Sequence, residues 1–319
     1  MQDFFSTMKQ IKQSLHRKFD RFFFDENWQT IIIKSSPLEF LQFPSLKNKI
    51  YHKKSIGFCF YADPFILIKN SKIYLFFERY SYFLKCGFID FIIINTDTFS
   101  ILRHEKNIIK SNKHLSFPYI LEDEGKIVII PECQEKELKM YEINDKIEVI
   151  SNKYIYKTGF VDSVVIKKDG IYYLFTTKVK KYNDCDLHIF YSKNLNESEW
   201  TEHPKSPVNT GFYGSRMAGN LFHENGKIFR PGQISKNTYG DGICVYEVEK
   251  LSINEYKEAL KYEIFGESIG FDGIHTFSSN GKYIAIDVKK HRYSVIKFAI
   301  KILRLTKIHF LFLIFRIKT

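Results

Sequence analysis

Cysteine is scarce and unpaired in this sequence of 319 residues. An odd, dispersed set without a Cys-X-X-Cys pair argues against a disulfide framework and a zinc cluster, and favours a reducing cytoplasm. The five are Cys59, Cys86, Cys133, Cys185 and Cys244. The sequence also lacks a P-loop and a Gly-X-Gly-X-X-Gly motif. We therefore predict no cofactor and no bound metal.

Long apolar runs are also missing. Residues 1–24 contain no continuous apolar stretch of the length that a signal peptide needs, so we do not expect secretion. Near the other end of the chain, the longest uncharged run covers residues 308–315. A run of that length is too short to span a bilayer.

The net charge of +12 is confined to the two ends of the chain. Residues 1–24 carry a net +3 and residues 289–319 a net +9, which leaves residues 25–288 with no net charge. A neutral body argues against a nucleic-acid groove, because such a groove needs a basic surface. We therefore expect no nucleic-acid partner and an electrostatic role for the ends.

Both ends have amphipathic, basic patterns. Apolar residues recur at helical spacing in residues 1–24, which predicts a basic amphipathic helix there. They are Phe4, Met8, Ile11, Leu15, Phe19 and Phe22. Residues 291–319 are interpreted as a second basic amphipathic segment. Either both segments pack on the rest of the protein or on a partner copy, or they bind anionic lipid, which attracts each Lys or Arg by roughly 1 kcal/mol. We expect a cytoplasmic protein held peripherally on the inner face of a membrane.

A hairpin pattern recurs between these ends. Each copy has an apolar strand, a short polar turn and a second apolar strand, and the five copies align without a gap over sixteen positions. The copies are residues 63–78, 117–132, 162–177, 218–233 and 273–288. Their turn positions are Ser71, Gly125, Gly170, Gly226 and Gly281. A turn glycine between period-2 strands is typical of a hairpin, and repeats of this length indicate propeller blades. We predict an all-β, five-bladed β-propeller over residues 25–290, in which residues 28–33 complete the last blade.

Equivalent positions of propeller repeats gather around one central channel. The first repeat position is Asp63 in the first copy and Asp162 in the third, while the last position is Glu78, Glu132 and Gln233 in three copies. Polar or aromatic residues beside these positions complete the predicted pocket. They are Tyr119, Arg216, Asn220, Arg230, Asp272 and His275.

These motifs carry a resemblance to a known family. The segments ADPFIL…YLFFE, FPYIL…IIPE, VDSVV…YYLF, AGNLF…FRPGQ and GIHTF resemble the five-bladed propeller domain at the N-terminus of glucosamine inositolphosphorylceramide transferases. They are more distantly similar to glycoside hydrolase family 43 and invertase-like propellers, as is LHIFYSKNLNESEWTEHP. The resemblance covers about residues 55–290, and it implies this propeller fold and an action on glycans.

The hydrolase pattern transfers only in part. Those enzymes resemble one another in a base on blade one, an Asp on blade three and a Glu proton donor on blade four. Asp63 and Asp162 match the first two, but blade four reads SRMAGNLF and offers no carboxylate. Because glycoside hydrolysis needs a proton donor, Glu132 or Glu78 would have to supply it.

Several of these residues also have a purely structural interpretation. Asp63 before Pro64 is also typical of a turn acid, and Glu132 of a solvated strand end. Arg216 suits either bidentate binding of a phosphate or an ion pair with one of the two Asp residues. His275 is either a sugar-binding or proton-transfer group or a satisfied core histidine. The Asp-X-Asp at residues 184–186 precedes a strand without a Rossmann-like unit, so we interpret it as a loop.

Three functions remain as alternatives. The leading hypothesis is a membrane-associated glycosyltransferase of surface polysaccharide or glycolipid assembly, with Asp63 or Asp162 as the base and Arg216 and Arg230 stabilising a phosphate leaving group. The second is a glycosidase that uses Asp63, Asp162 and Glu132. The third is a noncatalytic carbohydrate-binding propeller. The expected partners are a carbohydrate or glycolipid, a sugar nucleotide in the first case, and an anionic membrane surface.

Overall fold

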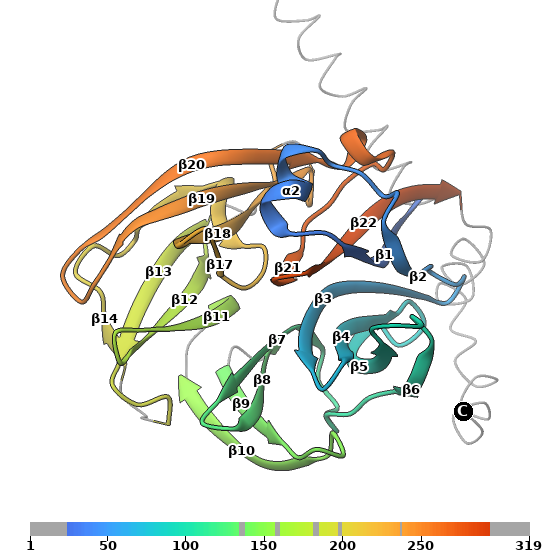
Figure 1. The fold of residues 1–319 in the computed structure, drawn as a ribbon, viewed down its shortest axis with the longest axis horizontal. Coiled ribbons are helices and arrows are strands. Elements are labelled where there is room, and N and C mark those ends of the chain that lie inside the picture. The colour runs from blue at the N-terminus through green and yellow to red at the C-terminus, as the bar shows by residue number, and fades with distance from the viewer. Residues whose placement is uncertain are drawn as a thin grey trace, which may run out of the picture.

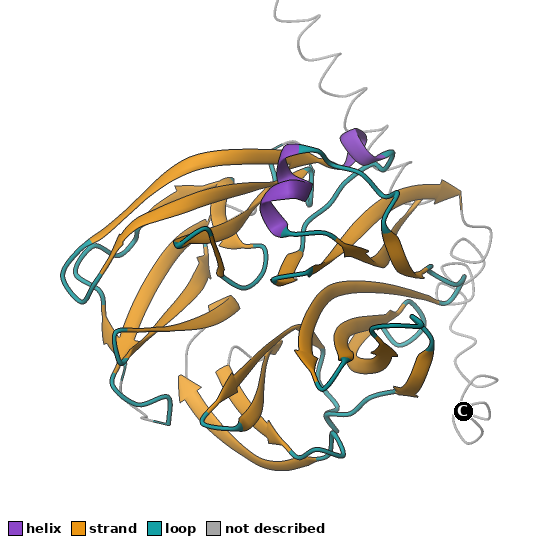
Figure 2. Cartoon of the chain, viewed as in Figure 1, coloured by secondary structure: helices purple, strands orange, loops and turns teal. Residues whose placement is uncertain are grey.

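The computed structural model describes residues 24–133, 138–156, 160–180, 185–196, 200–236 and 238–293. Five antiparallel sheets stand side by side as the blades of a ring (Figure 1). Almost all of the described chain is strand or loop (Figure 2). The predicted five-bladed, all-β propeller is therefore confirmed. The terminal segments predicted over residues 1–24 and 291–319 lie outside the described residues except for residues 24 and 291–293, which belong to strands of the propeller.

Each blade has four or five strands. Blade 1 contains β3 (Cys59–Lys69), β4 (Lys72–Ser81), β5 (Cys86–Asn95) and β6 (Ile101–Glu105). Blade 2 contains β7 (Leu115–Asp123), β8 (Lys126–Cys133), β9 (Leu138–Ile143) and β10 (Val149–Tyr156). Blade 3 contains β11 (Phe160–Lys168), β12 (Ile171–Val179), β13 (Cys185–Ser192), β14 (Thr201–Glu202) and β15 (Asn209–Gly211). Blade 4 contains β16 (Tyr213–Met217), β17 (Phe222–Glu224), β18 (Lys227–Ile234), β19 (Gly242–Leu251) and β20 (Tyr256–Phe265).

Blade 5 closes the ring with strands from both ends of the described chain. Its order is β21 (Phe277–Asn280), β22 (Tyr283–Tyr293), β1 (Phe24–Lys34) and β2 (Lys49–Lys53). Strand β1 pairs with β22 over its full length, from Phe24 opposite Tyr293 to Lys34 opposite Tyr283. The prediction that residues 28–33 complete the last blade is confirmed. The two short helices are α2 (Pro37–Gln42) and η1 (Gly266–Ile269).

The hairpin turns define one end of the propeller, which we call the turn end. In four blades both central turn residues have positive φ, as two-residue type I′ turns require. In blade 5 the pair Asn280–Tyr283 encloses Gly281 and Lys282, and only Gly281 has positive φ. The fifth copy is therefore offset by one residue from the gapless alignment. Counted along the ladder, Lys289 and not Val288 occupies its last repeat position.

We call the opposite end, where the inner strands begin, the site end. Helix α2 follows β1 at the turn end, where the Leu38 N–H donates to Glu224 Oε2 at 2.8 Å. The core consists of three apolar clusters, each formed by residues from more than one blade. No helix among the described residues has the length and apolar character to cross a membrane.

Candidate functional site

Inner strands β3 and β11 each carry a bulge at the site end. The register of β3 with β4 shifts between Ala62 and Phe65, and that of β11 with β12 shifts between Val161 and Val164. Asp63 and Asp162 lie in these bulges with φ of 50° and 51°. Non-glycine residues rarely adopt this conformation, and such strain is concentrated at functional sites. The repeated first position thus places each of these two carboxylates in a specialised backbone setting.

Asp63 forms a buried cluster with blade 5. Its Oδ1 lies 3.0 Å from His275 Nε2, and His275 Nδ1 lies 2.9 Å from Asp287 Oδ1. The Thr276 hydroxyl donates to Asp63 Oδ1 at 3.1 Å, and the Phe117 N–H of blade 2 donates to Asp63 Oδ2 at 3.1 Å. Asp287 in turn accepts from the backbone N–H of Asp63 at 2.9 Å. The cluster therefore joins blades 5, 1 and 2.

The charges in this cluster decide what it can bind. Burial opposes a charge on His275, but Asp287 and Asp63 outweigh burial and raise the pKa of His275 to about 10. His275, the Phe117 N–H and the Thr276 hydroxyl hold the pKa of Asp63 below its usual value despite burial. Ligand atoms of Asp63, His275 and Asp287 lie within 4.8 Å of one another, a spacing that suits a metal ion. A protonated imidazole has no lone pair to donate, so at neutral pH the imidazolium takes the place of a cation.

Asp162 forms a second cluster with blades 2 and 4. Arg216 Nε donates to Asp162 Oδ2 at 2.6 Å. Gln233 Nε2 lies 3.5 Å from the same oxygen and donates to the Met217 carbonyl at 2.9 Å. The carboxyl of Glu132 is hydrogen-bonded to Asp162. The sequence left open an ion pair between Arg216 and one of the two Asp residues, and the structure shows the pair with Asp162.

Glu132 is the titratable group of this cluster that is best placed for proton transfer. Burial and the neighbouring charge of Asp162 raise the pKa of Glu132 to about 8, although Arg216 opposes the shift. Its side chain is only half-buried, whereas Asp162 is buried. A carboxyl with a pKa near neutrality suits general acid or base catalysis.

Glu78 is buried beside the first cluster. Burial and the charge of Asp63 raise the pKa of Glu78 well above its usual range. His114 Nε2 is 3.5 Å from Glu78 Oε1. His114 Nδ1 accepts from the Gly87 N–H at 2.9 Å, so the ring proton lies on Nε2, and burial lowers the pKa of His114. Burial therefore favours the neutral form of both groups here.

Sequence reasoning missed several residues that enclose the two clusters. The ring of Trp28 lies 4.1 Å from that of His275, and the ring of Tyr239 lies 5.1 Å from it. The Arg216 guanidinium lies 5.5 Å from the Tyr239 ring. Burial raises the pKa of Tyr239, and the charges of Asp63, Asp162 and Glu132 all act in the same direction. Tyr239 thus lies near both clusters, and we treat the two clusters as one candidate site.

Lys289 is another residue that the gapless alignment hid. It is fully buried and holds the loop that carries Tyr239, donating to Thr238 Oγ1 at 3.2 Å and to the Tyr239 carbonyl. With a one-residue gap in the fifth copy, the alignment would have assigned Lys289 to the last repeat position, the position that Glu78 and Glu132 occupy in their copies. Asp287 and Tyr239 carried no comparable signal.

Two predicted binding residues lie away from these clusters. Arg230 is fully buried within blade 4, where Nε and Nη2 both donate to Glu258 at 2.6 Å and Nη1 donates to the Gly214 carbonyl at 2.8 Å. Asp272 is exposed and accepts from the His291 N–H at 2.7 Å. These positions favour structural roles for both side chains over the substrate-binding roles predicted from the sequence.

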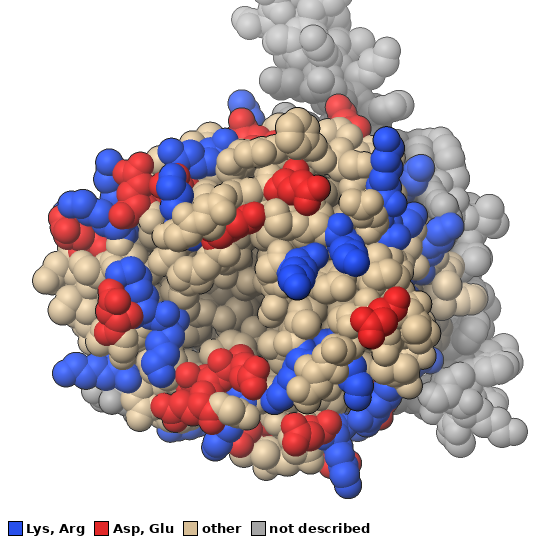
Figure 3. All heavy atoms as spheres, in the orientation of Figure 1, with Lys and Arg blue, Asp and Glu red and all other residues tan. Residues whose placement is uncertain are grey.

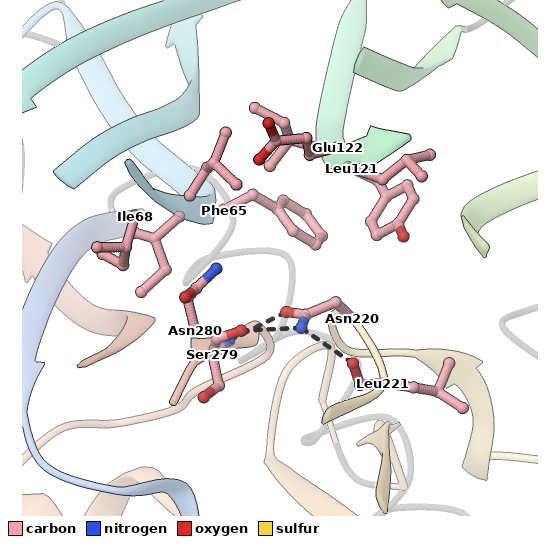
Figure 4. Close-up of a pocket in the computed structure, with 12 residues that line it drawn as sticks. Phe65, Ile68, Leu121, Glu122, Asn220, Leu221, Ser279 and Asn280 are labelled. Atoms are coloured by element: carbon pink, nitrogen blue, oxygen red, sulfur yellow. Dashed lines mark hydrogen bonds between the residues drawn. The ribbon is translucent and has the colours of Figure 1, made fainter. Parts of the chain in front are cut away.

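Two further predicted residues, Tyr119 and Asn220, line a separate pocket of about 340 Å³ at the turn end (Figure 4). Tyr119 donates to the Val165 carbonyl, and the Asn220 amide is engaged by the backbone of Ser279. Figure 3 shows the propeller from the side of α2, hollowed near the centre of the ring. The structure therefore divides the predicted set: Asp63, Glu78, Glu132, Asp162, Arg216, Gln233 and His275 meet at the site end, and these two do not.

The Asp-X-Asp at residues 184–186 is not part of either group. Residue 184 is outside the described residues, and Cys185 begins strand β13. Asp186 is buried and forms an ion pair with Lys180 at 2.7 Å. This ion pair gives Asp186 a structural partner without a metal.

The arrangement at the site end suits recognition of a polar, partly anionic ligand. Arg216 donates a hydrogen bond from Nε to Asp162, and it donates to no other side-chain carboxylate in the described part of the chain. That geometry leaves the two terminal nitrogens of the guanidinium for a bidentate contact with a phosphate or carboxylate. Glu132 lies beside Arg216 with a pKa near neutrality, and Tyr239 adds an aromatic face.

Comparison with known proteins shows the family to which the chain is similar. The sequence profile of a family described as glucosamine inositolphosphorylceramide transferase 1, N-terminal, matches residues 41–286. A protein named glucosamine inositolphosphorylceramide transferase 1 from Oryza sativa subsp. japonica is 30% identical over 206 residues, covering 62% of this chain and 27% of its own length. Its namesake from Arabidopsis thaliana is 31% identical with the same coverage. The name is that of a glycosyltransferase, and the chain spans about a quarter of the length of these curated relatives.

Solved structures show the likeness in fold. An exo-β-1,3-galactanase from Clostridium thermocellum has a TM-score of 0.52 at 13% identity, covering 72% of this chain and 53% of its own. A thermostable family-43 glycoside hydrolase has a TM-score of 0.51 at 10% identity, covering 63% of this chain and 74% of its own. The predicted distant similarity to family 43 propellers is confirmed at the level of the fold.

Proposed function

This chain belongs to the N-terminal family of glucosamine inositolphosphorylceramide transferases, and from that premise we propose that it acts in glycosyl transfer during surface polysaccharide or glycolipid assembly. The observation that carries the proposal is the pairing of Arg216 with the Asp162–Glu132 carboxyl pair at a half-buried position. A guanidinium beside a carboxyl of raised pKa suits departure of a phosphate and proton removal from an acceptor hydroxyl. The names of the relatives point to an acceptor with a phosphoinositol headgroup.

The proposed step uses two side chains directly. The acceptor hydroxyl gives its proton to the Glu132 carboxylate, and its oxygen forms a bond to the anomeric carbon of the donor sugar. The bond from that carbon to the donor phosphate breaks, and its electron pair goes to the phosphate oxygen, which Arg216 stabilises. Glu132 is a better base than Asp63, because the contacts of Asp63 with His275, Thr276 and Phe117 stabilise it as a carboxylate and hold its pKa low.

A specific observation favours a second candidate, glycoside hydrolysis. Below its pKa of about 8, Glu132 is protonated, so it has the protonation state of a proton donor beside Asp162. Blade 4 does not supply the donor, since Arg216 occupies that region. The chain covers only about a quarter of the length of its curated relatives. A noncatalytic glycan-binding role is therefore the third possible outcome of the test.

The membrane is part of the proposal as well. We place the protein in the cytoplasm, peripherally on the inner face of a membrane, because all of the net charge lies in the two ends of the chain. A glycolipid acceptor would be presented at that surface.

A transfer assay with a panel of sugar nucleotides and lipid-linked acceptors tests the proposal. Glu132→Gln and Arg216→Ala should each lower transfer by roughly 10²-fold or more, the contribution of a well-placed catalytic group. Thermal unfolding controls for the fold. Arg103→Ala, which removes a half-buried arginine of β6 paired with Glu105, is the matched control that should retain full activity.

Three outcomes separate the candidates. Full activity of both Glu132→Gln and Arg216→Ala would remove these residues from the mechanism. Hydrolysis of a neutral glycoside at ordinary enzyme rates, with no transfer, would establish the glycosidase. Glycan binding with neither reaction would leave a noncatalytic propeller.

A further inference from the structure

Two loops of blade 1 expose large apolar side chains at the site end. The loop between β2 and β3 presents Ile56 and Phe58, which are 57% and 58% exposed. The loop between β4 and β5 presents Leu84, which is 52% exposed. We call residues 54–58 and 82–85 the blade-1 tips. Apolar side chains grouped in this way mark interaction surfaces more often than chance exposure.

The backbone of the tips is held in place by hydrogen bonds. Ile56 and Cys59 exchange two backbone hydrogen bonds of 3.1 and 2.8 Å, and the Tyr82 N–H donates to the Phe58 carbonyl at 3.1 Å. The last bond joins the two tips to each other. Their apolar side chains are therefore presented together by an ordered scaffold, which lowers the entropy lost when they bind.

The charged residues within the tips and next to them in the sequence are all basic. Residues 49–60 and 81–89 contain no Asp or Glu, while Lys54 and Lys85 are exposed within the tips. Apolar groups with lysines beside them match the interface of an anionic bilayer, where the side chains enter the headgroup layer and the ammonium groups meet lipid phosphates. A protein partner with an apolar face would not require this basic surround.

The tips are at the end of the propeller that carries the acid clusters. Strand β4 leads from Glu78 directly into the second tip. Further exposed apolar residues lie at the same end, namely Val179 at the end of β12, Phe212 before β16 and Phe265 at the end of β20. Phe24 and Tyr293 pair at this end too, so the basic segments predicted from the sequence continue from there.

We propose that the site end of the propeller docks on an anionic lipid surface through the blade-1 tips, with Phe58 and Leu84 entering the headgroup layer. The orientation turns the half-buried side chains of Arg216 and Glu132 toward the bilayer, where a glycolipid headgroup is presented. The binding of a glycolipid headgroup by Arg216 and Glu132 rests on the proposed function, whereas the docking of the tips on lipid does not.

Depth-dependent fluorescence quenching tests the docking on the full chain. Tryptophan is introduced as Phe58→Trp, and as Ile101→Trp for a matched control, since Ile101 is 54% exposed but begins β6 at the turn end. Vesicles contain phosphatidylcholine with about one third phosphatidylserine, some of it brominated in the acyl chains. The native Trp28 and Trp200 are buried and give a constant background. We expect quenching of Phe58→Trp and none of Ile101→Trp.

Sedimentation with the same vesicles gives the second measurement. The double variant Phe58→Ser/Leu84→Ser should bind at least tenfold more weakly, whereas Ile101→Ser/Leu102→Ser at the turn end should bind as the wild type does. Lys54→Gln and Lys85→Gln should each weaken binding about fivefold, and only on anionic vesicles.

The opposite results overturn the proposal. Absence of quenching at Phe58→Trp while the protein sediments with vesicles means that other segments hold it there. Suppose that the wild type is a dimer, that Phe58→Ser/Leu84→Ser is a monomer, and that Phe58→Trp is not quenched. The tips then form an interface with a second copy of the chain and not with lipid. Quenching without any glycosyl transfer would refute the proposed function alone, and transfer without quenching would refute the docking alone.

Discussion

The charge of His275 controls the electrostatics of the first acid cluster, and pH is the perturbation that removes it. Burial alone would keep the imidazole neutral, but Asp287 and Asp63 raise the pKa of His275 from 6.5 to about 10. A group whose pKa is raised on folding stabilises the folded state fully below the unfolded pKa. That stabilisation is lost as the pH rises through the folded pKa, so the window runs from 6.5 to about 10.

The size of the effect follows from the two pKa values. The whole shift corresponds to about 5 kcal/mol, at about 1.4 kcal/mol for each pKa unit. Between about pH 6 and about pH 9, the linkage relation assigns a loss of about 3 kcal/mol in unfolding free energy to this one group. His275→Gln has no such titration, so its stability should fall by about 3 kcal/mol less than that of the wild type over the same range.

Urea unfolding at the two pH values measures this difference, and His223→Gln, an exposed histidine of β17, is the matched control. Ring-nitrogen NMR shifts follow the imidazole itself. His52 is an internal reference in these spectra, because burial together with Lys49 and Lys54 lowers the pKa of His52 to about 4. At pH 8 the imidazole of His275 should appear protonated and that of His52 neutral.

A titration of His275 near its ordinary pKa would refute this reasoning. So would equal pH dependence of unfolding in the wild type and His275→Gln. A neutral imidazole between Asp63 and Asp287 would then be free to ligate, and a stabilising shift in melting temperature on addition of a divalent cation would identify a metal site.

Four further experiments have defined outcomes. If Glu132 is the base, transfer rates should rise with pH through about 8, and Glu132→Gln should lose that limb of the profile along with its activity. Arg216→Lys keeps the charge but loses the planar pair of donors, so KM for the donor should rise at least tenfold; an unchanged KM would argue against phosphate binding there. Arg230→Met leaves Glu258 buried without its partner, which should cost about 3–5 kcal/mol in urea unfolding, and adding Glu258→Met should recover part of that loss. Removal of residues 292–319 should reduce sedimentation with anionic vesicles while the melting transition persists; equal sedimentation would contradict a membrane role for that segment.

The fold could be predicted because its signals are local. Period-2 apolar strands and a turn residue with positive φ specify a hairpin within about sixteen residues, and five spaced copies specify the number of blades. The one error in the alignment arose where the turn changed type. Gly281 occupies the first central position of its turn, whereas Gly226 occupies the second. Aligning the two glycines therefore shifted the predicted strand positions of the fifth copy by one residue.

The repeat also predicted which carboxylates come together, since equivalent positions converge on the axis. It placed Asp63, Asp162 and Glu132 at the same end, as the structure does. Arg230 shows the limit of this logic: it is only three residues before the last position of its copy, yet its guanidinium reaches Glu258 on β20 within its own blade. The repeat position fixes where a backbone lies, while the direction of a long side chain depends on its neighbours.

The charges of the site were decided by tertiary structure alone. Thr276 and Asp63 are 213 residues apart in sequence and hydrogen-bonded in space, and no local pattern encodes that contact. Whether His275 is a cation and whether Glu132 holds a proton depend on burial and on the distance to each neighbouring charge. The sequence by itself therefore determined the blades and the ring of polar positions, because hairpin signals act over a few residues. The pairing and protonation of those residues follow from closure of the ring, which brings blades 5, 1 and 2 into contact around buried Asp63.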